Sequence, residues 1–303
     1  MIRPAAFCAN SQTRQSNAFQ SKRADFQDAQ HLAREEFDRL TQALAHAGVR
    51  IHKFEDAIDP PKPDAIFPNN WVTFHADGSV VLYPMLAANR RMERRHDILD
   101  ALIGDNDFEV SRRVDLTDLE LNGHYLEGTG SLVLDRAKKI AYACLSPRTD
   151  ESALAIFSKS MNYELCTFRA SDQQGTPVYH TNVLMSIGRK FAVICPESID
   201  AADKPRILHR LRQTREFVLE ISPEQMHSFA GNILELATTN QRSIIALSTR
   251  AYDSLTPSQR DTLSSCTDSF VHVPIPTIEC LGGGSVRCMI AEIFLPRRRA
   301  NSA

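Results

Sequence analysis

Short apolar runs rich in β-branched residues recur along the chain in pairs, and a short polar turn joins the two members of each pair. Runs of this length around turn residues are typical of β-hairpins. The sequence therefore predicts four hairpins, formed by Trp71–Phe74 with Ser79–Tyr83, Ser131–Leu134 with Ile140–Leu145, Val183–Ile187 with Phe191–Cys195, and Asn232–Leu236 with Ser243–Leu247.

Each hairpin is followed by a stretch with helical spacing of apolar residues or with residues that favour a helix start. In the last of these stretches, Thr256 precedes Pro257, which suits a first helical position because no N–H is needed there. The four predicted helices span Asn89–Ile103, Asp150–Met161, Ala201–Glu216 and Thr256–Ser265. The repeated unit is a strand, a second strand and a helix.

The two ends of the chain supply a fifth unit. The C-terminal part predicts a last strand, Cys288–Leu295, and the N-terminal part predicts a helix, Ala29–Ala47, whose apolar face holds Leu32, Phe37, Leu40 and Leu44. The leading strands start near residues 70, 131, 183, 232 and 288, and repeats of this length are typical of propeller-like arrays. Because no Pro-, Gly- or Ser-rich linker divides the chain, residues 1–303 are expected to form a single α/β domain in which like units close into a ring.

Equivalent positions in a ring of like units point toward the same end of its axis, so residues at the starts of the leading strands should meet. These residues are Asn70, Glu127, His180, Asn232 and Cys288. A lone buried cysteine or histidine is more often a packing residue than a catalytic one. A thiol, an imidazole and a carboxylate at equivalent positions form the set that covalent catalysis needs, so the sequence predicts an active site there.

Composition narrows the classes of function. The chain has 303 residues, 43% of them apolar, and a net charge of −2, which indicates an ordinary globular protein without the basic field that nucleic acid or an anionic membrane would attract. The start lacks a long apolar segment and no stretch approaches the length of a membrane span, so a cytoplasmic location is expected. The seven cysteines are scattered without zinc-site spacing, so we expect neither a metal nor another cofactor.

Five stretches, PDAIFPNNW, YLEGTGSLVLD, LSPRTD, YHTNVLMSIG and GGGSVRC, occur in this order along nearly the whole chain. They resemble the guanidino-group-modifying superfamily, which includes arginine deiminases, dimethylarginine dimethylaminohydrolases and amidinotransferases, and among its members the citrulline-utilisation hydrolases most. The resemblance implies a five-bladed, pseudo-fivefold α/β propeller of ββαβ units. It also implies that Cys288 is the nucleophile, His180 the general acid and base, and Glu127 the carboxylate that contacts the imidazole and the substrate nitrogens.

The resemblance further assigns substrate-binding roles. Asp64 would hold the α-amino group of an amino-acid substrate, and Arg90 and Arg148 would bind its α-carboxylate, a task suited to a planar fork of donors. Asn10 is a candidate for a lid over the site, although a solvated turn residue is an equally good interpretation. The expected partner is a small amino acid, and a homo-oligomer stays open.

Two amide side chains distinguish this chain from families that it resembles. Deiminases and dimethylarginine hydrolases carry an aspartate where Asn70 stands, and deiminases carry another where Asn182 stands. Those carboxylates suit a guanidinium cation. The amides Asn70 and Asn182 favour a neutral ureido group, so the sequence predicts hydrolysis of citrulline to ornithine, ammonia and carbon dioxide. The alternatives are an arginine deiminase or dihydrolase, or a dimethylarginine hydrolase. Some dihydrolases also place an asparagine at the position of Asn70. An amidinotransferase and a non-catalytic amino-acid-binding propeller are more distant alternatives.

Overall fold

A computed structural model of the chain describes residues 1–21, 28–104 and 108–298. In these ranges it has a mixed α/β fold with five sheets of short strands. Four sheets have three strands each, namely β3 (Val72–Phe74), β4 (Ser79–Leu82) and β5 (Arg112–Asp115); β6 (Leu132–Asp135), β7 (Ile140–Cys144) and β8 (Glu164–Phe168); β9 (Met185–Ile187), β10 (Phe191–Ile194) and β11 (Phe217–Glu220); and β12 (Leu234–Ala237), β13 (Ser243–Ser248) and β14 (Ser269–Val273).

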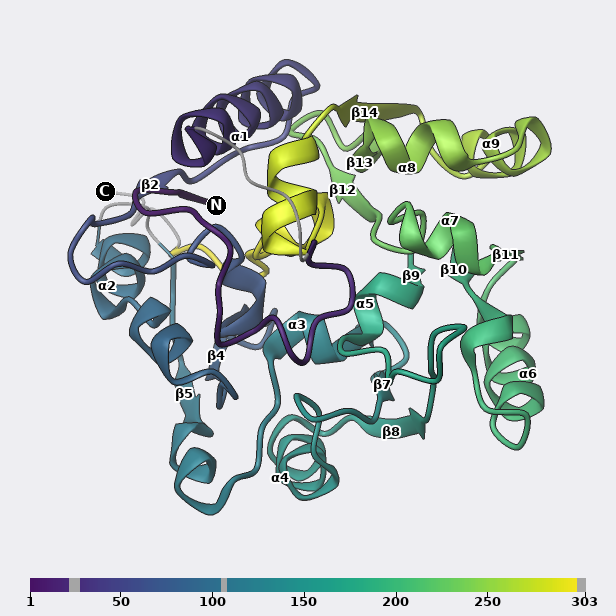
Figure 1. Ribbon diagram of the computed structural model, residues 1–303, viewed down its shortest axis with the longest axis horizontal. Helices are drawn as coiled ribbons and strands as arrows, with labels where there is room; N and C mark the ends of the chain where they lie inside the picture. Colours follow the sequence, from purple (N-terminus) through teal and green to yellow (C-terminus); the bar gives the residue numbers. More distant parts are fainter. Residues whose placement is uncertain (22–27, 105–107, 299–303) are drawn as a thin grey trace.

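The helices lie mostly between the second and third strand of a sheet. Their bounds are α1 (Ala29–His46), α2 (His96–Gly104), α3 (Gly128–Ser131), α4 (Glu151–Met161), α5 (Thr181–Leu184), α6 (Lys204–Thr214), α7 (Pro223–His227), α8 (Thr249–Ser254) and α9 (Pro257–Ser264). Figure 1 shows α1, α2, α4, α6 and α9 at the rim of the molecule, whereas α3 and α5 lie nearer the middle.

All four three-stranded sheets share one topology. The first two strands form an antiparallel hairpin, and the third strand pairs with the second in parallel. A parallel neighbour requires a crossover connection, and α2, α4, α6 and the pair α8 and α9 provide it. The four predicted hairpins are therefore present, and each belongs to a ββαβ unit.

Local sequence explains where the crossover helices begin. The side chain of Asp150 accepts hydrogen bonds from the backbone of Ser152 and Ala153, and Thr256 forms a capping box with Gln259. The predicted helix Asn89–Ile103 is instead divided into a 3₁₀ segment, Ala88–Glu93, and α2. Arg94 has an extended backbone between them, so a single helix cannot run through.

The fifth unit differs from its prediction. β1 (Ile2–Arg3) pairs in parallel with β2 (Phe54–Glu55), and α1 lies between them in sequence and packs on β1 and β14. The predicted strand Cys288–Leu295 is wrong, because Cys288 lies in the 3₁₀ turn Val286–Met289. The Cys288 N–H donates to the Ser285 carbonyl and not to a neighbouring strand. In the described part of the chain, the only β-bridge of the residues after this turn joins Arg297 to Phe108.

Apolar residues of neighbouring units pack into four clusters. On α1, the buried positions include Phe37, Leu40 and Leu44 as predicted, while Leu32 is only partly buried. These side chains pack with Val286 and Met289, so α1 supports the turn that holds Cys288. None of the helices in the described ranges is both long and apolar enough to cross a membrane.

Candidate active site

Short turns just ahead of the leading strands bring the predicted residues together. Asn70 ends the 3₁₀ turn before β3, Glu127 directly precedes α3, and His180 directly precedes α5. α3 packs on both the turn Pro68–Asn70 and α5, and that turn packs on the turn that holds Cys288. Residues far apart in the sequence therefore meet at one end of the sheets.

The lack of a side chain at Gly130 allows these turns to pack closely. A Cβ atom there would lie 2.6 Å from the imidazole of His180 and 2.4 Å from Nδ2 of Asn70. In the run before the thiol, Gly283 has a φ of 63°, a conformation that side chains rarely adopt. A Cβ atom at Gly283 would also lie 2.6 Å from the side chain of Asn17. The first role of Gly283 is therefore to pack against the N-terminal segment.

Glu127 and His180 form a buried pair. Nε2 of His180 lies 2.8 Å from Oε2 of Glu127, which also receives Nη1 of Arg148 at 3.3 Å. Burial by itself would raise the pKa of Glu127, but the charges of Arg148, His180 and Arg90 outweigh it and hold this pKa well below its usual range. Burial lowers the pKa of His180 to about 4, although the hydrogen bond and charge of Glu127 oppose the shift. At neutral pH the pair is thus a carboxylate and a neutral imidazole.

Cys288 is 3% exposed and lies between two amides. Nδ2 of Asn232 is 3.3 Å from Sγ, and Nδ2 of Asn182 is 3.6 Å from it. Burial raises the pKa of the Cys288 thiol, while the Ser285 backbone, Asn232, Arg287 and Asn182 act in the opposite direction. Cys288 therefore rests as a thiol whose neighbours are arranged to donate to a thiolate.

Arg90 is buried in a cluster of acceptors. Its Nε and Nη2 donate to the two carboxylate oxygens of Glu93, each at 2.9 Å, and Nη1 donates to Oδ1 of Asn70 at 3.0 Å. Asp64 lies 3.5 Å from Nε of Arg90. Burial raises the pKa of Glu93 to about 7, with the charge of Arg90 opposing the shift. These contacts fix the orientation of the Arg90 guanidinium before any substrate binds.

The N-terminal segment covers the other arginine. Arg148 donates through Nη2 to the Thr13 carbonyl at 3.1 Å and to Oγ of Ser16 at 2.8 Å, and its guanidinium lies 4.9 Å from the ring centre of Tyr179. Asn10, 1% exposed, donates to Oδ2 of Asp64 at 2.7 Å. Asn10 is therefore buried beside Asp64 and is not a solvated turn residue.

The cavity that the predicted site residues share is small. Asp64, Asn70, Arg90, Arg148, His180 and Cys288 line one cavity of about 10 Å³, together with Thr13, Asn17, Phe67, Tyr179, Gly282 and Gly284. This is room for about one water molecule, so a larger ligand requires the lining residues to move. Among the described residues no group of His, Cys, Asp or Glu has the arrangement of a metal site.

Sequence reasoning placed Asn232 at a strand start but gave it no role, whereas its amide is closer to Sγ of Cys288 than that of Asn182. Its place among the leading-strand starts, with Glu127, His180 and Cys288, was the available signal. Glu93 was missed, although its spacing of three residues from Arg90 suits a pair on one helical turn. Nothing in the sequence indicated that Thr13 and Ser16 would contact Arg148, since that contact spans more than 130 residues.

The arrangement combines a thiol, a neutral imidazole held by a carboxylate, amide donors around the sulfur, and two fixed guanidinium groups. A thiol nucleophile with an adjacent proton carrier can attack an electrophilic carbon, and fixed arginines can bind a carboxylate. This is the equipment for covalent hydrolysis of a small substrate that carries a carboxylate.

Comparison with known proteins is consistent with this chemistry. Residues 3–295 match the family model described as N,N dimethylarginine dimethylhydrolase, eukaryotic. None of the curated proteins matches the chain.

Solved structures share the fold at low identity. The substrate-bound N-terminal domain of a variant of ArgZ, an arginine dihydrolase from the ornithine-ammonia cycle in cyanobacteria, has a TM-score of 0.73 and 17% identity, with 97% of this chain and 98% of that chain covered. Apo ArgZ has a TM-score of 0.74 and 17% identity over 97% of this chain, which spans 40% of that chain. A dimethylarginine dimethylaminohydrolase variant in its adduct with S-methyl-L-thiocitrulline has a TM-score of 0.63 and 14% identity, over 95% of this chain and 96% of that one.

Proposed function

The chain belongs to the N,N-dimethylarginine dimethylhydrolase family, and from this premise we propose that it hydrolyses a guanidino C–N bond of an arginine-like amino acid through a covalent adduct on Cys288. It is a hydrolase of C–N bonds other than peptide bonds. The observation that carries the proposal is that Cys288, His180, Arg90 and Arg148 line one cavity, with Glu127 bonded to His180 behind it.

The covalent step uses the thiolate of Cys288. A cationic guanidino group placed beside the sulfur lowers the pKa of the thiol, because an opposite charge favours the ionised form. The proton of the Cys288 thiol passes to the neutral imidazole of His180, and Sγ attacks the central carbon. The C–N bond to the departing amine breaks after His180 delivers this proton to that nitrogen. Water then attacks the adduct and gives its proton to His180. The carbon–sulfur bond breaks, and the thiolate is restored.

The remaining polar groups position the substrate. Glu127 keeps the imidazole of His180 in one orientation, and Arg90 and Arg148 bind the α-carboxylate while Asp64 binds the α-amino group. Because Ser16 and Thr13 now occupy donors of Arg148, we propose that the segment containing Asn10 shifts when substrate enters. Arginine is our first substrate candidate, in keeping with the arginine dihydrolases that share the fold.

Citrulline is the second candidate, and a specific observation favours it. Oδ1 of Asn70 accepts from Arg90, which leaves Nδ2 of Asn70 as a buried donor without a hydrogen-bond partner in the described part of the chain. A ureido oxygen accepts such a hydrogen bond, whereas a guanidinium has only donors. Hydrolysis of the ureido group of citrulline would give ornithine, ammonia and carbon dioxide.

A substrate panel tests the proposal. Initial rates are measured with arginine, Nω-methylated arginines, citrulline and agmatine, and ammonia and amino-acid products are quantified. Turnover of arginine or its methylated forms supports the guanidino hydrolase, and turnover of citrulline alone moves the assignment to the second candidate. Transfer of the amidino group to added glycine would indicate an amidinotransferase, and binding without turnover of any compound would contradict the enzyme. Agmatine should be a poor substrate, because it lacks the carboxylate that the two arginines bind.

We also propose that the five sheets close into a pseudo-fivefold α/β propeller that forms a single domain. Four units of identical topology and the meeting of their leading-strand starts support closure. A single cooperative transition in calorimetric unfolding is expected, and two separate transitions would contradict the single domain. In an experimental structure, a gap between the sheet of β12 to β14 and the segment before β3 would contradict closure.

A further inference from the structure

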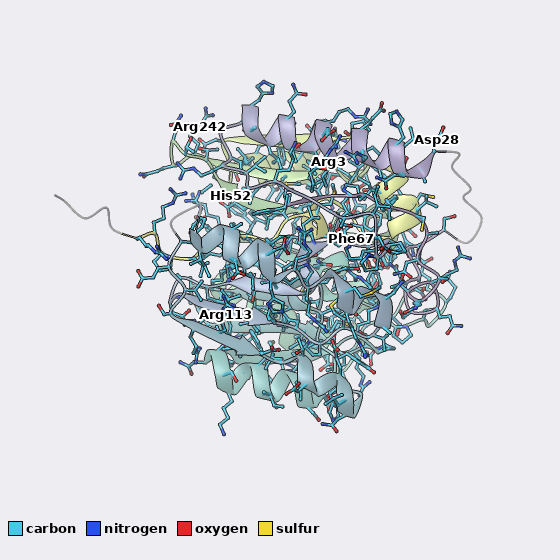
Figure 2. The ribbon with its side chains drawn as sticks, turned by 90° about the vertical axis from the view of Figure 1, so that its left-hand side faces the viewer. Arg3, Asp28, His52, Phe67, Arg113 and Arg242 are labelled. Atoms are coloured by element: carbon cyan, nitrogen blue, oxygen red, sulfur yellow. The ribbon has the colours of Figure 1, made fainter. Side chains whose placement is uncertain are left out.

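A second and much larger cavity reaches Asn182 and Arg287 beside Cys288, although Cys288 itself does not line it. Its volume is about 1000 Å³, and it shares no lining residue with the small cavity. Figure 2 shows His52 and Arg242, which line the large cavity, on the left of the molecule and Phe67, which lines the small one, on the right. The two cavities are therefore separated along the short axis of the molecule.

The large cavity carries an excess of positive charge. Eight arginine or lysine side chains line it against three carboxylates, although the whole chain has a net charge of −2. A cavity lined mainly by one sign of charge concentrates ligands of the opposite sign. The lining therefore favours an anionic ligand.

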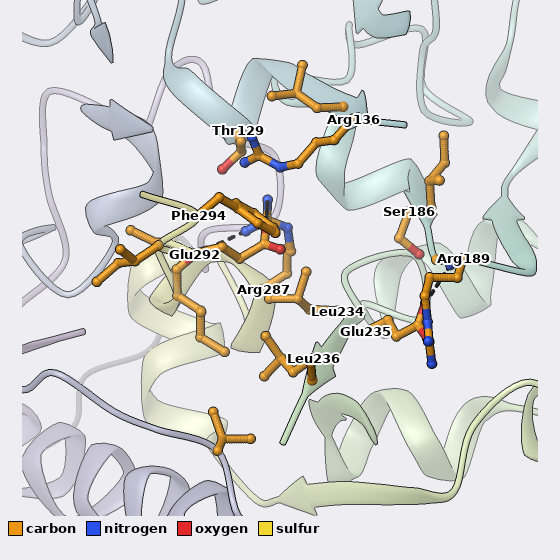
Figure 3. A pocket seen from close by; sticks show the side chains of 18 of the residues that line it. Thr129, Arg136, Ser186, Arg189, Leu234, Glu235, Leu236, Arg287, Glu292 and Phe294 are labelled. Carbon is orange, nitrogen blue, oxygen red and sulfur yellow. Dashed lines mark hydrogen bonds and ion pairs between the residues drawn. The ribbon is translucent and has the colours of Figure 1, made fainter. Parts of the chain in front are cut away.

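Two arginines converge inside the cavity beside one aromatic ring, as Figure 3 shows for Arg136, Arg287 and Phe294. The guanidinium of Arg136 lies 4.1 Å from the ring centre of Phe294, and its hydrogen-bond partners include only neutral groups such as the Phe74 carbonyl and His75. Arg287 pairs with Glu292 at 3.4 Å, and the charge of Arg136 contributes to lowering its pKa, after burial as the main cause. Two positive charges thus face one carboxylate.

The opposite wall offers a hydroxyl and apolar side chains. Oγ of Ser186 is buried and has no hydrogen-bond partner among the residues that the structure describes. Leu234 and Leu236 line the floor between Ser186 and the arginines, and Phe294 is 40% exposed. A buried donor that lacks a partner is costly unless a ligand or water satisfies it.

We propose that this cavity is a binding site for an amphipathic monocarboxylate, whose head lies between Arg136 and Arg287 and whose apolar part lies on Leu234, Leu236 and Phe294. Within the group of Arg136, Arg287 and Glu292, one net positive charge remains, which a single carboxylate matches. The volume lies at the upper end of the range for small-molecule pockets, about 300–1,000 Å³. The proposal does not rest on the catalytic assignment, since neither Cys288 nor His180 lines this cavity and Asn182 takes no part in the proposed contacts.

Isothermal titration calorimetry with octanoate tests the site. Octanoate should bind saturably at a ratio of one per chain, while octanamide, which has the same tail without the charge, should bind at least about tenfold more weakly because a charged head gains stronger hydrogen bonds. Inorganic phosphate alone should bind weakly, because it lacks the apolar part. Absence of saturable octanoate binding, or equal affinity for octanamide, would overturn the proposal.

Variants locate the binding on the cavity. Arg136→Ala should weaken octanoate about tenfold or more, and Glu292→Gln should strengthen it by removing the competing carboxylate. The matched control is Arg113→Ala, an exposed arginine of β5 that pairs with Asp100 outside the cavity and should have no effect. Leu236→Glu places a negative charge on the apolar floor and should abolish binding, which keeps the test decisive if Arg136→Ala does not fold.

The catalytic site also holds arginines that attract carboxylates, so it must be distinguished. Arg148→Ala and Cys288→Ser should leave octanoate affinity unchanged if the ligand lies in the large cavity. Loss of octanoate binding in Arg148→Ala, with retention in Arg136→Ala, would place octanoate in the small cavity and overturn the proposal.

Discussion

Cys144 and Cys288 are both buried thiols, yet the groups nearest to their sulfur atoms differ. Sγ of Cys144 lies 3.7 Å from the Val178 carbonyl and 3.9 Å from the Leu145 carbonyl, so its S–H acts as a donor to acceptors. Sγ of Cys288 lies nearest to the amide nitrogens of Asn232 and Asn182, at 3.3 and 3.6 Å, and farther from their amide oxygens, at 3.7 and 3.9 Å. Carbonyl neighbours favour a thiol and amide donors favour a thiolate.

Burial therefore does not separate a structural cysteine from a nucleophile. Burial raises the pKa of Cys144 to about 12, and it raises that of Cys288 as well. What differs is whether the surroundings can stabilise negative charge on sulfur once a substrate arrives. Of the two thiols, only Cys288 lines a cavity together with an imidazole.

Replacement of the nucleophile should give the largest effect. Cys288→Ser should reduce turnover at least about 10³-fold, because a serine hydroxyl is far less nucleophilic than a thiolate near neutral pH. The steady-state rate on the best substrate of the panel measures the loss, and circular dichroism checks the fold. Cys195→Ser, another buried thiol, is the control and should keep wild-type kcat. Retention of more than a few per cent activity in Cys288→Ser would remove Cys288 from the mechanism.

Removal of the charge behind His180 should have the second largest effect. Glu127→Gln keeps the size of the side chain but leaves the imidazole without its carboxylate, so kcat should fall by about 10²–10⁴, the range for general acid and base catalysis. KM should change much less than kcat, and a KM-only effect would assign Glu127 to binding alone. Because Arg148 also contacts Glu127, the pH profile of kcat should be recorded as well, and it should shift if His180 loses its partner.

The amide beside the sulfur should matter less, and it bears directly on the contrast between the two cysteines. Asn232→Ala removes the donor at 3.3 Å from Sγ, so alkylation of Cys288 by iodoacetamide at a fixed pH near 8 should slow about tenfold, the value of a hydrogen bond to a charged group. The alkylation rate as a function of pH should show a higher thiol pKa. An unchanged profile would mean that the amides pack against Cys288 without stabilising a thiolate.

Much of this arrangement follows from sequence periodicity. The four hairpins and the crossover helices were predictable because period-2 and period-3.6 patterns and the capping residues Asp150 and Thr256 are local. The meeting of Glu127 and His180 was predictable only by assuming that equivalent positions in a ring converge. The turn at Cys288 was mispredicted because the apolar run 288–295 has the pattern of a strand, and this pattern does not show whether a partner strand exists.

The contacts of the N-terminal residues Asn10, Thr13 and Ser16 with the candidate site could not be predicted from the sequence. Asn10, Thr13 and Ser16 are polar residues in a segment without periodicity, and their roles come from contacts with Asp64 and Arg148 that only the folded chain provides. The large cavity with its excess of positive charge could not be predicted from the sequence either. Arg136 and Arg287 are more than 150 residues apart, and an isolated arginine is usually a solvated surface residue.

Folding stability should depend on pH through His180. Its pKa is about 4 in the folded state and ordinarily about 6.5 when exposed, so the unfolded chain takes up a proton in this interval and the folded chain does not. Because the unfolded state binds more protons there, the free energy of unfolding should fall as the pH drops from about 6.5 to 4, by at most about 1.4 kcal/mol per unit from this group. Urea unfolding at pH 7, 5.5 and 4.5 measures it. His180→Gln should show a shallower decline, and an equal slope would exclude His180 as the source.

The smallest effect on activity is expected at Cys144, on the other side of the comparison. Cys144→Ser should leave kcat and KM unchanged, because the Cys144 side chain does not line the cavity of Cys288. Cys144→Ser should instead lower the free energy of unfolding. The shorter serine side chain cannot place its oxygen within 3.0 Å of both carbonyls that the sulfur now reaches at 3.7 and 3.9 Å, so a buried hydroxyl is left poorly bonded, at a cost of about 1–3 kcal/mol. Urea unfolding at pH 7 measures this loss. If Cys144→Ser instead lowered kcat while keeping stability, acceptor neighbours would no longer identify a structural thiol in this fold.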